Sequence, residues 1–161
     1  MGHNQKLKRD QKKQLFIGIS LLIVLIGGWG VFQNWYQQRG LVNGQFVSAS
    51  GELRATYQLE VADEPDEQAK GLMFRKSLAP KSGMIFIHKS DEMQSFWMKN
   101  TFIALDMIFV DVNKQVVGIL NSVPILNEEP RKVDKPSRYV IEIAAGEAQK
   151  AGIQVGDKFL F

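Results

Sequence analysis

An uncharged stretch covering residues 14–38 restricts this chain more than any other feature of its sequence. Its central part, LFIGISLLIVLIGGWGVF (residues 15–32), is apolar apart from one serine and its glycines. A helix of that length rises about 27 Å at about 1.5 Å per residue, close to the bilayer's hydrocarbon core of about 30 Å. Continuing the helix through Trp35 and Tyr36 places two aromatic rings at the far interface. The stretch therefore predicts one transmembrane helix over residues 15–36.

The charges that flank this stretch predict its orientation. Residues 1–14 carry a net charge of +4, which leaves −1 for the rest of a chain whose total is +3. The basic residues before the stretch are Lys6, Lys8, Arg9, Lys12 and Lys13, and Arg39 follows it. Positive charge concentrates on the cytoplasmic side of membrane helices. We therefore expect a cytoplasmic tail over residues 1–14, with the downstream domain periplasmic or extracellular.

A cleaved signal peptide is the alternative to this membrane anchor. The small residues Gly27, Gly28 and Gly30 leave cleavage open. However, the apolar run is longer than the usual h-region of about 7–15 residues, and no A-x-A-like site follows it. The sequence therefore favours an uncleaved, single-pass signal anchor in the cell membrane.

Composition sets aside several classes of function. The pI of 9.1 belongs to the basic tail and not to a basic globular surface, so nucleic acid is not an expected partner. The chain has no cysteine, which removes disulfides, thiolate zinc sites and cysteine nucleophiles.

Beyond the membrane segment, residues 37–50 predict a polar linker and residues 51–161 a single domain. In ELRATYQLEV (residues 52–61), apolar and polar residues alternate, as in a half-buried strand. A short helix should follow, because Asp63 or Glu64 can cap it and Pro65 suits its first turn.

Later apolar runs predict further strands. These runs are MIFIH (84–88), MIFVDV (107–112), VVGIL (116–120), RYVIEIA (138–144) and KFLF (158–161). A hairpin turn at Asn113 and Lys114 should join the second and third, and residues 124–137 predict a long loop. Many short strands with one or two short helices indicate a mainly β domain, a small antiparallel barrel or sandwich.

The order of several motifs resembles the domain of unknown function 192 (DUF192) family. The motifs are GLMFRKSL (71–78), SGMIFI (82–87), FWMKNTFIALDMIFVD (96–111), YVIEIAAG (139–146) and GIQVGD (152–157). The resemblance implies a small, mainly β domain, often exported or membrane-anchored, with no agreed activity. Many members have a proline where Ala104 stands and a cysteine where Ile125 stands. Family chemistry that uses that cysteine cannot operate in this chain.

Two carboxylates within apolar runs are the main candidates for a functional site. Asp106 follows the phase of Ile108 and Val110 while the other face is also apolar, so its carboxylate should be buried. Glu142 likewise lies between apolar residues, within YVIEIAA, so its carboxylate should also be buried. A buried charge needs a partner and hydrogen bonds, or it takes up a proton. Local candidates for a partner of Asp106 are Lys99, Arg75 and Asn100.

Two interpretations of these carboxylates remain open. In the first, they tie loops to the barrel through backbone N–H groups and a cation. In the second, Asp106 holds the Lys99-Asn100-Thr101 segment against the barrel and the carboxylates line a small pocket. The predicted pocket residues are Arg75, Trp97, Met98, Lys99, Asn100, Thr101, Asp106 and Glu142.

Three functions are compatible with these features. They are a membrane-anchored extracytoplasmic accessory or binding domain, an enzyme using Asp106 and Glu142 with Lys99, and a structural subunit of an envelope complex. No cofactor and no metal site is predicted, because the chain lacks cysteine and His88 has no neighbouring ligands in the sequence. We expect His88 to be a surface residue at the end of a strand. The expected partners are the membrane and either an envelope protein or a small ligand.

Overall fold

The computed structural model describes residues 40–161. The predicted cytoplasmic tail and membrane helix, residues 1–14 and 15–36, lie outside the described residues. Within residues 40–161, no helix has the length and hydrophobicity needed to cross a membrane.

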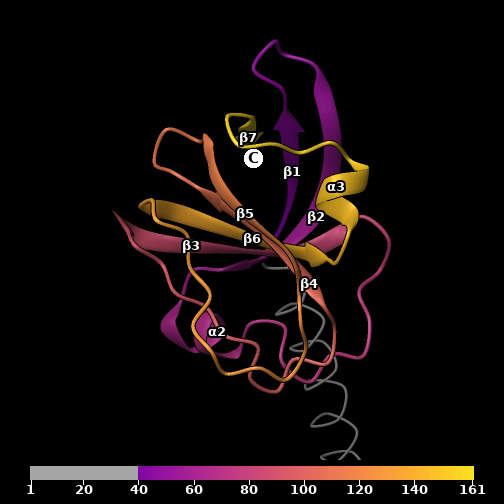
Figure 1. Ribbon diagram of the computed structural model, residues 1–161, viewed down its shortest axis with the longest axis vertical. Helices are drawn as coiled ribbons and strands as arrows, with labels where there is room; N and C mark the ends of the chain where they lie inside the picture. Colours follow the sequence, from indigo (N-terminus) through magenta and orange to yellow (C-terminus); the bar gives the residue numbers. More distant parts are fainter. Residues whose placement is uncertain (1–39) are drawn as a thin grey trace, which may run out of the picture. The chain divides into compact units, whose positions relative to one another are not determined.

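Seven strands and two short helices make up the described domain (Figure 1). In chain order they are β1 (Leu41–Val47), β2 (Leu53–Ala62), α2 (Pro65–Lys70), β3 (Ser82–Glu92), β4 (Leu105–Val110), β5 (Val116–Val123), β6 (Ser137–Ala144), α3 (Glu147–Lys150) and β7 (Lys158–Leu160). The predicted mainly β fold is confirmed, with every predicted strand run at its expected place.

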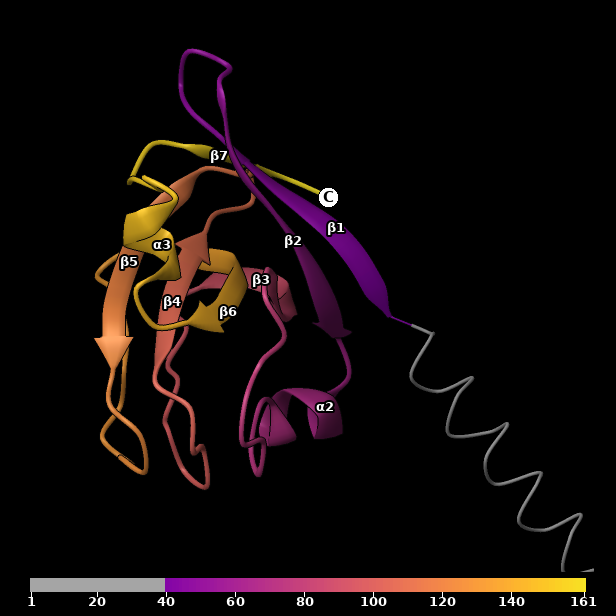
Figure 2. The same ribbon diagram turned by 90° about the vertical axis from the view of Figure 1, so that its right-hand side faces the viewer.

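The strands form one mixed sheet in the order β5-β4-β6-β3-β2-β1-β7. Strands β2 and β3 run parallel, and the other neighbouring pairs run antiparallel. The predicted antiparallel barrel or sandwich is therefore wrong. The sheet stays open, because its edge strands β5 and β7 do not form a ladder; one isolated bridge joins Gln115, just before β5, to Lys158 of β7. The parallel pair needs a crossover connection, and that connection carries α2 (Figure 2).

The predicted linker over residues 37–50 is also wrong over residues 41–47, because these residues form β1. β1 pairs with both β2 and β7, and its Phe46 is fully buried against Tyr57 and Phe159. Position 44 of this strand is a glycine because a larger residue would clash there: its Cβ would lie 2.6 Å from the Phe159 ring. The segment has the composition of a linker because its polar residues lie on the exposed face of β1 and its glycine allows close packing against Phe159.

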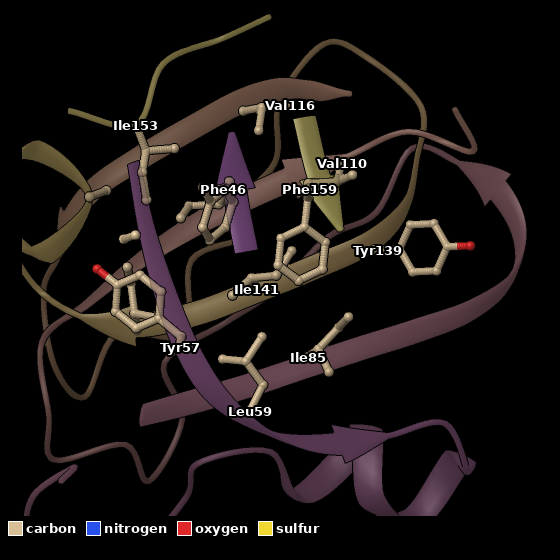
Figure 3. Packing of buried hydrophobic residues seen from close by; sticks show 14 residues of the cluster. Phe46, Tyr57, Leu59, Ile85, Val110, Val116, Tyr139, Ile141, Ile153 and Phe159 are labelled. Carbon is tan, nitrogen blue, oxygen red and sulfur yellow. The ribbon is translucent and has the colours of Figure 1, made fainter. Parts of the chain in front are cut away.

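The two faces of the sheet carry two separate cores. The hairpin-side cluster includes Phe46, Tyr57, Leu59, Ile85, Ile108, Ile141, Ile143 and Phe159, and Figure 3 shows Phe46 and Phe159 side by side within it. The loop-side cluster includes Leu72, Met84, Phe86, Met98, Met107, Phe109 and Val140. Alternation along the shared strands β3, β4 and β6 divides successive residues between the two clusters.

The helix α2 follows its sequence signals closely. Glu64 caps it and Pro65 opens it. Gly71 ends it with a φ of +46°, a conformation that glycine adopts without steric cost. Gln68 donates a hydrogen bond to the Ile87 carbonyl at 2.9 Å, so the helix is tied to β3. In both ribbon views α2 lies at the end of the domain opposite the β1–β2 turn (Figures 1 and 2).

Candidate functional site

Asp106 lies on β4 with no exposed surface, on the face that carries the hairpin-side cluster. Its Oδ1 accepts a hydrogen bond from the Ser122 backbone N–H at 2.8 Å. Its Oδ2 accepts one from the Ala148 N–H, in the first turn of α3, at 2.9 Å. No ion pair to Asp106 is formed among residues 40–161. The carboxylate therefore joins two backbone segments without a cation.

A bulge explains why a carboxylate is needed at this position. Leu105 pairs with Val123 but Met107 pairs with Leu120, so two residues of β5 stand opposite Asp106 alone. A bulge leaves backbone groups without ladder partners, and Asp106 satisfies the Ser122 N–H. Asp106 thus accepts hydrogen bonds from backbone N–H groups, as the first interpretation predicts, but without the cation that this interpretation includes. The predicted anchoring of Lys99-Asn100-Thr101 by Asp106 is wrong, because both oxygens bond elsewhere.

Glu142 lies on the opposite face of the same sheet. The register between β4 and β6 places Glu142 beside Met107 and Asp106 beside Ile143, so the two carboxylates point to different sides. Glu142 is 4% exposed and forms no hydrogen bond or ion pair with any residue that the structure describes. The expected grouping of both carboxylates in one pocket is therefore wrong.

A cavity of about 350 Å³ opens on the loop-side face of the sheet. Its lining comprises Gln68, Ala69, Lys70, Gly71, Leu72, Met73, Phe86, His88, Ser95, Phe96, Trp97, Thr101, Glu128, Pro130 and Glu142. This volume lies within the range of about 300–1,000 Å³ that is typical of small-molecule sites. Aromatic rings and aliphatic groups supply most of the wall, while Glu142 is the deeply buried acid.

Two loops form the cavity wall opposite α2 by pairing with each other. Phe96 and Arg131 exchange two backbone hydrogen bonds, of 2.9 and 2.7 Å. The Met98 N–H donates to the Asn127 carbonyl at 2.7 Å. These bonds bring Trp97 from one loop beside Glu128 from the other. The cavity therefore lies between these loops and one face of the sheet, and not at the mouth of a barrel as the sequence predicts.

Three of the eight predicted pocket residues line this cavity: Trp97, Thr101 and Glu142. Thr101 is buried, while Trp97 is half exposed, with the Lys99 ammonium 5.3 Å from its ring centroid.

The other predicted pocket residues serve different contacts. Arg75 pairs with Glu60, with Nη2 and Oε2 2.6 Å apart. Met98 is fully buried in the loop-side cluster. The Asn100 carbonyl accepts a hydrogen bond from the Phe74 N–H at 2.9 Å, at a φ of +52° for Asn100 itself.

His88 is the main site residue that sequence reasoning missed. Strand β3 continues to Glu92, so His88 lies within the strand, and the predicted strand-end surface position is wrong. Its ring lies 6.0 Å from the Phe96 ring, and its buried Nε2 has no hydrogen-bond partner among the described residues. Its position two residues after Phe86, on the same strand face, was the available signal.

Burial shifts the pKa of two titratable groups in the cavity wall, Glu142 and His88. Desolvation raises the pKa of Glu142 to about 8, so this side chain is a mostly neutral carboxylic acid at pH 7. Desolvation also lowers the pKa of His88, with a smaller opposing effect of Glu92, so that its imidazole is neutral at that pH.

Metal ligands are not grouped in this domain. Within the described range, no three His, Cys, Asp or Glu side chains are placed to hold a metal ion.

Comparison with known proteins identifies the family. The DUF192 family model, described as "Uncharacterized ACR", matches residues 45–161. The chain belongs to the DUF192 family.

Two solved structures share this DUF192 fold. One is a protein of unknown function from Novosphingobium aromaticivorans DSM 12444, 38% identical, with a TM-score of 0.71 over 75% of this chain and 85% of that one. Another, from Sinorhizobium meliloti 1021, carries a name that suggests a transcription regulator. It is 28% identical, with a TM-score of 0.71 over 76% of this chain and 96% of that one. The comparison with curated proteins finds no match.

Both expected departures from the DUF192 pattern lie away from the buried part of the cavity. Ala104 is half-buried just before β4, and its carbonyl accepts a hydrogen bond from the Ala145 N–H at 3.0 Å. Ile125 is exposed on the loop after β5. Neither residue lines the cavity.

Proposed function

We propose that this protein is a binding domain whose loop-side cavity takes a small molecule. Glu142 carries the proposal, because this residue is only 4% exposed, lines the cavity and has no hydrogen-bond or ion-pair partner among the described residues. An unpaired buried polar group costs free energy, so its retention at a cavity wall indicates that a ligand completes it. Trp97 and Phe96 add an aromatic wall, as is common in ligand sites.

An enzyme that uses Asp106 and Glu142 together is not supported by this geometry. The two carboxylates lie on opposite sheet faces, and Asp106 is sealed by its two backbone donors. A general acid and base must both reach the reacting groups. Binding without such paired-carboxylate chemistry is therefore the function that we propose.

Screening the full chain against a small-molecule extract in nonionic detergent tests the binding function. The retained compounds are identified by mass spectrometry. Ala69→Trp places a large side chain in the cavity lining, whereas Ala79→Trp places the same side chain at an exposed position outside it. We expect a compound that the parent and Ala79→Trp retain and that Ala69→Trp loses. Retention that does not distinguish the two variants would contradict the proposal.

We also propose that the domain is held outside the cytoplasm by an uncleaved helix over residues 15–36. The basic tail and the uncharged apolar stretch support this topology. Protease added to outer-membrane-permeabilised cells should degrade the domain. Full protection, or a mature N-terminus near Gly30, would contradict the anchored topology.

A further inference from the structure

We propose that the cavity recognises an organic cation, such as an amine or a quaternary ammonium group. The inference rests on the proposed binding function and specifies the chemistry of its ligand. Its basis is the combination of the buried Glu142 carboxyl with the aromatic side chains of Phe86, Phe96 and Trp97 in one cavity wall.

Among residues 40–161, no side chain supplies a cation to Glu142. Arg75 is engaged with Glu60, and the Lys99 ammonium lies over the Trp97 ring, outside the cavity lining. Lys70 does line the cavity, but its side chain is exposed at the end of α2. A charge that enters with the ligand would therefore be the one that pairs with the buried carboxylate.

The rest of the wall suits a cation that carries carbon substituents. Aromatic faces attract ammonium groups through their quadrupoles, and this attraction strengthens when water is excluded. The rings of Phe86 and Phe96 lie 4.9 Å apart in an edge-to-face arrangement, and both line the cavity together with Glu142. A bare metal ion fits less well, because the described residues do not group three acidic or histidine ligands.

The ionisation of Glu142 predicts how ligand affinity should depend on pH. The strand neighbours of Glu142 are uncharged: Met84 on β3 and Met107 on β4. The other titratable groups that line the cavity are Lys70, His88 and Glu128. Burial holds the pKa of Glu142 at about 8. A permanent cation binds the ionised acid, so its affinity should rise with pH by up to about tenfold per unit below that pKa. A neutral ligand that accepts a hydrogen bond from the acid should instead bind less tightly above pH 8.

Isothermal titration of the full chain in nonionic detergent tests this signature. The probes are choline and benzyltrimethylammonium, each paired with its uncharged isostere in which carbon replaces the ammonium nitrogen. At pH 8 we expect each cation to bind at least about tenfold more tightly than its isostere, and cation affinity to increase from pH 6.5 to pH 8.

Two variants assign the effect to Glu142. Glu142→Gln preserves the shape of the side chain and should remove both the preference for the cation and the pH dependence. Glu52→Gln makes the same change at an exposed position outside the cavity lining and should retain both. Retention of the pH dependence in Glu142→Gln, or its loss in Glu52→Gln, would overturn the assignment.

The outcome separates this inference from the proposed function. If the isosteres bind as tightly as the cations and Ala69→Trp blocks both, the cavity is a binding site and the cation inference is overturned. If neither kind of probe binds while an extract compound distinguishes Ala69→Trp from Ala79→Trp, the binding function holds and the cation inference again fails.

Discussion

Asp106 and Glu142 show how two buried carboxylates on neighbouring strands acquire different roles. Asp106 is satisfied by two backbone N–H donors on one sheet face. Glu142 faces a cavity on the other face and has no such donors among the described residues. The difference predicts opposite effects on stability. Removing the Asp106 carboxylate leaves two N–H donors unpaired, whereas replacing Glu142 by a neutral residue removes the cost of ionising a buried acid at high pH.

Asp106→Ala should lower the free energy of unfolding by about 2–4 kcal/mol, because the buried Ala148 N–H and the partly buried Ser122 N–H lose their acceptor. Asp106→Asn should lose less, since its amide oxygen can still accept one hydrogen bond. Urea unfolding of the 40–161 fragment measures both. Asp134→Ala, which removes an exposed carboxylate from a loop, is the control and should stay within about 0.5 kcal/mol of the parent. Equal stability of Asp106→Ala and the control would contradict the anchoring role.

Glu142 should make stability fall as the pH rises. Its folded pKa of about 8 exceeds its ordinary value of 4.5, so the folded state binds more protons than the unfolded state between those values. The stabilising effect is complete below about pH 4.5 and is lost as the pH passes through about 8, by on the order of several kcal/mol. Thermal melting between pH 5 and pH 9 should therefore show a decline that Glu142→Gln reduces. An identical decline in both proteins would exclude Glu142 as its source.

At the scale of elements, β1 decides where the domain begins. It contributes Phe46 to the hairpin-side cluster and pairs with both β2 and β7. A fragment over residues 40–161 should therefore unfold cooperatively with a β-type circular dichroism spectrum. A fragment over residues 51–161, the domain boundary that the sequence predicts, should be unfolded or much less stable, because β7 and Phe159 lose their partners. Equal melting temperatures for the two fragments would contradict this role of β1.

The loop after β5 is an element that packs closely without secondary structure. A Cβ on Gly118 would approach the Val133 side chain to 2.6 Å, so this loop lies directly on the strand. Gly118→Ala should cost about 1–3 kcal/mol through overpacking, and adding Val133→Ala should recover part of that loss. Chemical denaturation of the two single variants and the double variant measures the coupling. Additive effects would show that the two residues do not meet.

At the scale of the whole molecule, protection from hydrogen exchange should follow position in the open sheet. β6 pairs with β4 and β3 on its two sides, and residues 139–143 are buried. β5 and β7 form the edges and meet at one bridge. Amides of β6 should therefore exchange slowest and those of β7 fastest among the strands. Equal protection of β5, β6 and β7 would indicate a closed barrel instead.

The sequence by itself determined the features that depend on neighbouring residues. Alternation over residues 52–61 predicts β2, and Glu64, Pro65 and Gly71 predict the limits of α2, because these signals act within a few residues. The motif order likewise indicates the DUF192 family, which the match over residues 45–161 confirms. The membrane helix over residues 15–36 stays a prediction of the same local kind.

Only the tertiary structure decided how these elements meet. The opposite facing of Asp106 and Glu142 depends on the register of β4 against β6, two strands that are far apart in the sequence. The bulge opposite Asp106, the burial of the His88 Nε2 and the open sheet edges depend on such long-range pairing too. A shift of one residue in register exchanges the two faces of a strand. Local patterns therefore identified Glu142 as a buried acid, while its cavity and its lack of a partner came from the packing of distant segments.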